Sequence, residues 1–147
     1  MEVKIKKLFS GATLPSYSTE DSAGMDVVAF SKDDSNPQYT EYGLGWSIEI
    51  PKGYVGFIFP RSSVSKYDLD LANAVACIDA DFRGEVKLRF RRIKRNLPEG
   101  VRVCHKYNVG EKIGQLIIMP YPKIELKEVD ELSKTVRGEG GFGSTGV

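Results

Sequence analysis

The chain of 147 residues is poor in cysteine, histidine and tryptophan, and it has no excess of charge of either sign. Two cysteines, Cys77 and Cys104, are too few for the disulfide framework of a small secreted domain, so we expect free, buried thiols. One histidine leaves no histidine and cysteine set at the spacing of a metal centre. The 21 basic and 20 acidic residues give a net charge of +1, which favours neither nucleic acid nor a membrane surface as a partner.

Long hydrophobic runs are also absent. No segment has the length and apolar character needed to cross a bilayer, and the N-terminal residues MEVKIKKLF contain lysines where a signal peptide requires an apolar run. The length suits a single domain with a core of its own. We therefore expect a soluble, cytoplasmic, one-domain protein.

Alternation of apolar and polar residues with a period of two is the main structural signal. It occurs at residues 3–6, 86–91 and 124–127, and it is typical of half-buried strands. The runs LGWSIEI, YVGFIF and IGQLIIMP predict more deeply buried strands, and residues 62–67 predict one very short helical turn. Turn-forming residues separate these segments at 36–37, 51–53, 98–100 and 108–110. The pattern predicts an all-β fold over residues 1–136, either a jelly-roll-like distorted barrel or a sandwich.

Residues 137–147 differ in composition from the rest of the chain. The segment RGEGGFGSTG contains five glycines, which lose much backbone entropy on ordering and add no apolar surface to a core. Such a flexible arm suits an anionic, ring-bearing ligand, because Arg137, Ser144 and Thr145 can hold phosphate oxygens and Phe142 can cover a base. A disordered chain end explains the same composition equally well.

Two further segments carry candidate chemistry. Arg61, Ser62 and Ser63 begin the expected helical turn, where a guanidinium, two hydroxyls and backbone amides make a phosphate cradle, although a helix cap beside a surface arginine fits as well. The small apolar run AVAC leads into Asp79. Because the chain has no histidine or cysteine partners at the spacing of metal ligands, Asp79 suits a general base or an orienter of water better than half of a metal site. The alternative is that Asp79 and Asp81 only form the turn before Arg83.

Five motifs occur in order along nearly the whole chain: AGMD at residues 23–26, PRSS at 60–63, NAVACIDADFRGE at 73–85, GEKIGQLI at 110–117 and RGEGGFGSTG at 137–146. In this arrangement the sequence closely resembles the homotrimeric dUTP diphosphatases, or dUTPases. The resemblance implies hydrolysis of dUTP to dUMP and pyrophosphate by water attack on the α-phosphorus. This reaction keeps uracil out of DNA and supplies dUMP for thymidylate synthesis.

The resemblance also implies roles for individual residues. Asp79 is the expected catalytic residue. The expected phosphate-binding residues are Arg61, Ser62, Ser63, Gln115, Arg137, Ser144 and Thr145. The expected uracil and deoxyribose contacts are Asn73, Ala76, Cys77, Ile78, Phe82 and Phe142. Lys87 matches a position that some family members use at the substrate site, and a solvated strand face accounts for it equally well.

The cofactor and the assembly follow from the same resemblance. Mg²⁺ is expected to be held mainly by the triphosphate and water, with Asp26 contacting it only through water. The expected assembly is a homotrimer with sites between subunits, in which residues 137–147 reach across a neighbour and close over an active site.

The chain departs from the family pattern at several positions. Phe82 stands where tyrosine is usual, Ala76 where glycine is usual, and Glu111, Lys112 and Gly114 differ from the usual GDRIAQ of the fourth motif. Lysine keeps the charge of arginine and loses its bidentate fork. Two alternatives remain open: a catalytically weak dUTP-sensing or partner-binding homologue, and a dCTP deaminase-like enzyme. The second is disfavoured because Arg89 stands where deamination needs a glutamate.

Overall fold

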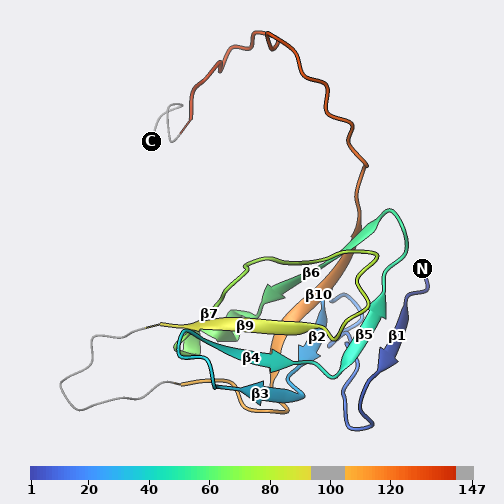
Figure 1. Cartoon of the computed structure of the whole chain (residues 1–147), viewed down its shortest axis with the longest axis vertical. Coiled ribbons are helices and arrows are strands. Elements are labelled where there is room, and N and C mark those ends of the chain that lie inside the picture. Colours follow the sequence, from blue (N-terminus) through green and yellow to red (C-terminus); the bar gives the residue numbers. More distant parts are fainter. Residues whose placement is uncertain (94–104, 142–147) are drawn as a thin grey trace, which may run out of the picture.

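The structure is a computed structural model, and it describes residues 1–93 and 105–141. These residues form strands and a single 3-10 helix, arranged as Figure 1 shows. In chain order the elements are β1 (Lys4–Lys7), β2 (Met25–Val28), β3 (Ser31–Asp33), β4 (Tyr39–Gly43), β5 (Trp46–Glu49), β6 (Tyr54–Pro60), η1 (Ser62–Lys66), β7 (Leu69–Leu71), β8 (Ala76–Ile78), β9 (Lys87–Arg92) and β10 (Lys112–Pro120). The prediction of an all-β fold with one very short helical turn is confirmed.

The strands form three antiparallel sheets. One has the order β2-β10-β6-β8, the second has the order β3-β4-β9-β7, and β1 pairs with β5 in the third. The longest ladder joins β10 to β6 and runs from Gly114 opposite Pro60 to Pro120 opposite Tyr54. The fold is jelly-roll-like, but its sheets stay separate and do not close into one barrel. Within the described ranges, no helix is long and apolar enough to cross a membrane.

The core forms where the inward faces of the sheets meet. In β9, Leu88 and Phe90 are buried while Lys87 and Arg89 are exposed, which is the alternation that the sequence predicts. Trp46, Leu44 and Ile58 are fully buried in the same core. Tyr42 packs edge-to-face against Phe90 at 5.7 Å between ring centroids. Burial of these large side chains is the main stabilising contribution to the fold.

Two sequence expectations differ from the structure. Residues 121–141 contain no strand, although the alternation at 124–127 predicts one, and Figure 1 shows this segment running away from the sheets. Among residues 1–93 and 105–141 no strand pairs with this segment, and Leu126 and Leu132 are 91% and 86% exposed. The thiol of Cys77 is free as expected but exposed, because β8 turns Ala76 and Ile78 inward and Cys77 outward. Cys104 lies outside the described residues.

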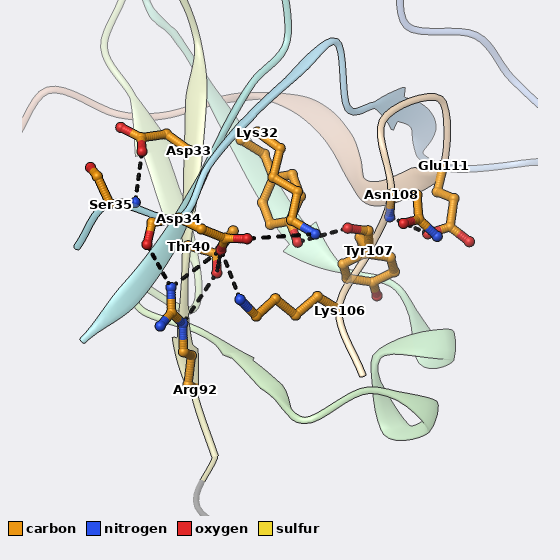
Figure 2. A network of polar contacts seen from close by, with 11 residues as sticks. Lys32, Asp33, Asp34, Ser35, Thr40, Arg92, Lys106, Tyr107, Asn108 and Glu111 are labelled. Carbon is orange, nitrogen blue, oxygen red and sulfur yellow. Dashed lines mark hydrogen bonds and ion pairs between the residues drawn. The ribbon is translucent and has the colours of Figure 1, made fainter. Parts of the chain in front are cut away.

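A charged network around Asp34 joins the β3–β4 connection to the end of β9 (Figure 2). The Asp34 carboxylate accepts hydrogen bonds from Thr40 Oγ1 at 2.6 Å, Lys106 Nζ at 2.9 Å and Arg92 Nη2 at 3.2 Å. Lys32 Nζ lies 3.8 Å from its other oxygen. Burial opposes ionisation of Asp34, but the bonds from Thr40 and Lys106 and the lysine charges prevail and lower its pKa to about 2.

The network predicts an acid-sensitive contribution to stability. Because the pKa of Asp34 falls on folding from the ordinary 3.8 to about 2, its contribution is complete above about pH 4 and is lost as the pH falls toward 2. Asp34→Asn should lower the free energy of unfolding by about 1 kcal/mol at pH 7, since the cluster is partly screened by water. The difference between wild type and variant should shrink below pH 4 and in high salt.

Urea unfolding at fixed protein concentration, at pH 7 and pH 3, measures this difference. Glu49→Gln serves as the control because its pair with Lys4 is exposed on both sides. A difference between wild type and Asp34→Asn that is independent of pH would contradict the assignment.

Candidate active site

A cavity of about 530 Å³ lies beside β8 and is lined by residues from β4, β6, β8 and β9 and their connections. The base, sugar and catalytic positions that sequence analysis selected, so far as the structure describes them, all line it: Asn73, Ala76, Cys77, Ile78, Asp79, Phe82 and Lys87. Phe142 lies outside the described residues. Folding therefore collects these residues around one hollow.

The pairing of β8 with β6 sets the direction of this part of the site. Cys77 stands opposite Phe57, and Ala76 stands opposite Ile58. β8 is the last strand of its sheet among the described residues, so its outer backbone edge has no strand partner there. Asp79 follows directly after β8 and is exposed at the cavity wall.

A tight turn after Asp79 holds Phe82 at the cavity. The Phe82 amide donates to the Asp79 carbonyl at 3.2 Å, and Arg83 Nη1 donates to the carbonyls of Ala80 and Phe82 at 2.6 and 2.8 Å. A Cβ on Gly84 would lie 2.8 Å from Phe82 Cζ, so the ring occupies space that only glycine leaves free. The Phe82 ring remains 43% exposed and available to a ligand.

Part of the cavity lining is a cluster of paired charges from β4 and β9. Glu41 accepts from Lys87 Nζ at 2.9 Å and from Arg89 Nε at 2.8 Å, and the three residues come from the paired strands β4 and β9. Hydrogen bonds from Lys87 and Arg89 lower the pKa of Glu41, and the bond to Glu41 raises the pKa of Lys87. Arg89, the position at which a deaminase needs a glutamate, is thus paired with a carboxylate.

A second cluster forms where β2, β10 and the end of β6 meet. Gln115 on β10 stands opposite Asp26 on β2, and Arg61 follows directly after β6. Asp26 is only 2% exposed, and its Oδ1 lies 3.1 Å from Arg61 Nε and accepts from Gln115 Nε2 at 3.4 Å. Two residues of the expected phosphate set thus share one buried carboxylate oxygen.

The other oxygen of Asp26 has partners that sequence analysis missed. Lys112 Nζ lies 2.7 Å from Oδ2, and Ser18 Oγ donates to Oδ2 at 2.6 Å. Burial opposes ionisation of Asp26, but the bonds from Lys112 and Ser18 and the charge of Arg61 outweigh it and lower the pKa of Asp26. No pattern in the sequence identifies Ser18, which is 94 positions from Lys112.

The helical turn after Arg61 is η1. The Val64 amide donates to the Arg61 carbonyl at 2.9 Å, and Ser65 Oγ donates to the Ser62 carbonyl at 2.9 Å. No side chain caps the start of η1, so the helix-cap explanation for these serines does not apply. Ser62 is exposed and Ser63 is half-buried.

Two residues of the fourth motif that differ from the family pattern, Glu111 and Gly114, have specific structural surroundings. Glu111 accepts hydrogen bonds from Tyr67 Oη and from the Asn108 amide, which holds the turn before β10. A Cβ on Gly114 would lie 2.8 Å from Ile58 Cγ2 and 3.1 Å from the Phe59 carbonyl, so the usual alanine would crowd the β10–β6 pair.

Within one chain the two clusters stay apart. Arg61, Ser62, Ser63 and Gln115 do not line the Asp79 cavity. Arg137 lies on the segment that leaves the sheets, where its Nε donates to the Gly140 carbonyl at 2.7 Å. Ser144 and Thr145 lie outside the described residues. The described chain therefore holds the expected base-side and phosphate-side residues in two separate clusters.

The described part of the chain has no preformed binding site for a divalent cation. It contains no group of three or more histidine, cysteine, aspartate or glutamate side chains that could hold a metal ion. Both oxygens of Asp26 contact protein cations, so this residue suits contact with a metal only through water.

Comparison with known proteins identifies the family. The dUTPase family model matches residues 10–146. The deoxyuridine 5'-triphosphate nucleotidohydrolase of Rickettsia felis is 43% identical over 99% of this chain and 97% of its own, and that of a Hydrogenobaculum species is 39% identical over 100% and 99%.

Solved structures agree with the sequence comparison. The dUTPase of Staphylococcus bacteriophage 80alpha with dUpNHpp superposes with a TM-score of 0.82 at 29% identity and covers 99% of both chains. A mutant dUTPase from phage phi11 of S. aureus, with a structural Mg(II) ion, has a TM-score of 0.74 at 25% identity, covering 89% of this chain and 98% of its own. The chain belongs to the dUTPase family.

Proposed function

We propose that this protein hydrolyses dUTP to dUMP and pyrophosphate. The observation that carries the proposal is the position of Asp79 in a dUTPase-family chain: an exposed carboxylate on the wall of a cavity lined by the expected base and sugar contacts. The named activity of the relatives supports the same reaction.

In the proposed mechanism the Asp79 carboxylate accepts a proton from a water molecule. The water oxygen bonds to the α-phosphorus while the bond from that phosphorus to the α–β bridging oxygen breaks, and pyrophosphate leaves. Catalysis of phosphoryl transfer depends chiefly on in-line positioning and on neutralising charge at the phosphate oxygens. Asp79 supplies the base, and the expected phosphate contacts supply the neutralisation.

Base selection is proposed to use the outer edge of β8. Because the amides and carbonyls on this edge have no strand partner in the described structure, they can pair with the donors and acceptors of uracil. Cytosine presents a different donor and acceptor order and would leave buried groups unpaired. Asn73 at the cavity adds a side-chain amide, and Phe82 supplies a ring on which the deoxyribose can pack without room for a 2′-hydroxyl.

The triphosphate is proposed to bind the second cluster, through Arg61, Ser62, Ser63 and Gln115. Mg²⁺ would accompany the triphosphate and be held by its oxygens and by water, with Asp26 contacting it only through water. The bound cation would neutralise part of the phosphate charge. Because the triphosphate and water supply the ligands of Mg²⁺, the protein needs no metal-binding site formed by its own side chains.

We also propose that the complete site forms in a homotrimer. Two separate clusters in one chain, together with an exposed apolar segment after β10, support the view that each site is assembled from different subunits. Residues 1–136 would form the body of the subunit, and residues 137–147 would close over a site with Arg137, Phe142, Ser144 and Thr145. Lys87, held by Glu41, would face the substrate from the cavity wall.

The first functional prediction concerns the nucleotide. Incubated with Mg²⁺, the protein should release pyrophosphate and dUMP from dUTP, whereas dCTP, dTTP and UTP should react at least about a thousandfold more slowly, as expected of a site built around base hydrogen bonds. Chromatography of the products with a pyrophosphate assay measures both. Comparable turnover of dCTP or UTP would contradict the role of β8 and Phe82, and deamination of dCTP would favour the deaminase alternative.

The second prediction concerns Asp79. Asp79→Asn should lower kcat by roughly a thousandfold, within the usual range for loss of a general base. The affinity for dUpNHpp should stay within about threefold, because the amide keeps the shape of the side chain. Asp81→Asn is the matched control, since Asp81 is also exposed and shares with Asp79 only a second hollow, not the cavity that the base and sugar contacts line. If the two variants lose activity equally, Asp79 is not the catalytic base.

The third prediction concerns assembly and the glycine-rich arm. Light scattering of the whole chain should give three times the subunit mass of 16.3 kDa. A chain ending at Val136 should remain trimeric yet lose at least about a hundredfold in kcat/KM, since positioning and charge neutralisation are lost together. A monomer with full activity, or a truncated trimer as active as the whole chain, would refute the corresponding part of the proposal.

A further inference from the structure

Ser18 and Lys112 both contact the Oδ2 oxygen of Asp26, and they also contact each other. Lys112 Nζ lies 2.7 Å from Asp26 Oδ2 and donates to Ser18 Oγ at 3.1 Å, while Ser18 Oγ donates to the same Oδ2 at 2.6 Å. Ser18 lies outside the five motifs, and Lys112 is one of the departures from the fourth. Neither residue lines the Asp79 cavity.

The bonds to Oδ2 restrict rotation of the carboxylate and so help to orient its other oxygen, because the two oxygens belong to one planar group. Arg61 Nε and Gln115 Nε2 both meet Asp26 at Oδ1, at 3.1 and 3.4 Å. Arg61 contacts Asp26 through Nε, so its two terminal amino groups are not used in this ion pair. The side chain of Arg61 is 30% exposed, so these groups can meet an anionic ligand.

The backbone around Ser18 does not need its hydroxyl for support. Ser16 and Asp26 already exchange amide–carbonyl bonds of 2.8 and 3.3 Å, which attach this loop to β2. The start of β10 is likewise held by buried Ile113 and by pairing with β2 and β6. Other contacts therefore hold the backbone here, and the hydroxyl of Ser18 and the ammonium of Lys112 both bind the Asp26 carboxylate.

We infer that Ser18 and Lys112 are positioning residues for the triphosphate, which act through Asp26 to hold Arg61 with its terminal amino groups turned toward the phosphates. This inference rests on the proposed function, since it deepens the phosphate-binding role of Arg61. A lysine can do here what the family's arginine would do, because a single short bond to one oxygen needs a point charge and not a fork.

The test compares two probes that differ in their phosphates. Affinities for dUpNHpp and for deoxyuridine, which has no phosphate, are measured by calorimetry on the whole chain for Lys112→Met, Ser18→Ala, the double variant and Lys112→Arg. Lys4→Met is the matched control, because Lys4 also pairs with a carboxylate, but on an exposed surface. Thermal midpoints on the same samples report any loss of structure.

Lys112→Met should weaken dUpNHpp binding about tenfold and Ser18→Ala about threefold, the scale of one charged and one neutral hydrogen bond. Deoxyuridine affinity should stay within about twofold in both variants, and Lys112→Arg should restore dUpNHpp binding. The double variant should lose less than the product of the single effects, because both residues act on one oxygen.

Equal loss of deoxyuridine and dUpNHpp affinity would overturn the inference, because it would show a structural role alone. Binding of dUpNHpp by Lys112→Met and Ser18→Ala as tight as by Lys4→Met would overturn it as well. If wild type releases no pyrophosphate from dUTP but still binds dUpNHpp in a Lys112-dependent way, the proposed hydrolysis fails and the positioning role stands. A wild type that binds neither probe overturns both.

Discussion

The pairing of β10 with β6 is the constraint on which both parts of the site depend. Leu116 stands opposite Ile58 in this ladder, and both side chains are fully buried. The period of a strand is two, so a shift of one residue would turn Leu116 out of the core. The register that buries Leu116 also places Gln115 beside Asp26 and ends β6 where Arg61 begins its turn. Core packing thereby sets the geometry of the phosphate cluster.

β6 also positions the residues around Asp79, because its other edge pairs with β8. β8 turns Ala76 and Ile78 into the core and leaves Asp79 at the strand end. β8 remains an edge strand in the described chain. Edge strands are usually protected because their free amides and carbonyls can pair with other chains. In this protein the free edge borders a cavity, where pairing with a base would use the same groups.

Departures from the family pattern are accommodated by local contacts. Lys112 reaches Asp26 with one short bond, and Gly114 leaves the space that Ile58 fills. Glu111 holds the preceding turn through Tyr67 and the Asn108 amide. Burying a carboxylate is costly unless charges and hydrogen bonds compensate it. Asp26 meets this requirement with two cations and a serine, so the changed motif keeps an ionised carboxylate in place.

The sequence by itself determined most of the strand pattern, the short turn at Ser62–Lys66 and the grouping of residues 73–82 near Asp79, because these depend on local periodicity and on a contiguous motif. Tertiary structure alone decided the exposure of Cys77 and the absence of a strand at residues 124–127, since both depend on which neighbours a strand finds. It also decided the convergence of Lys32, Arg92 and Lys106 on Asp34. Ser18 and Lys112 meet across 94 positions because β2 pairs with β10 and Ser16 pairs with Asp26 on β2, and no local pattern in the sequence predicts such pairings.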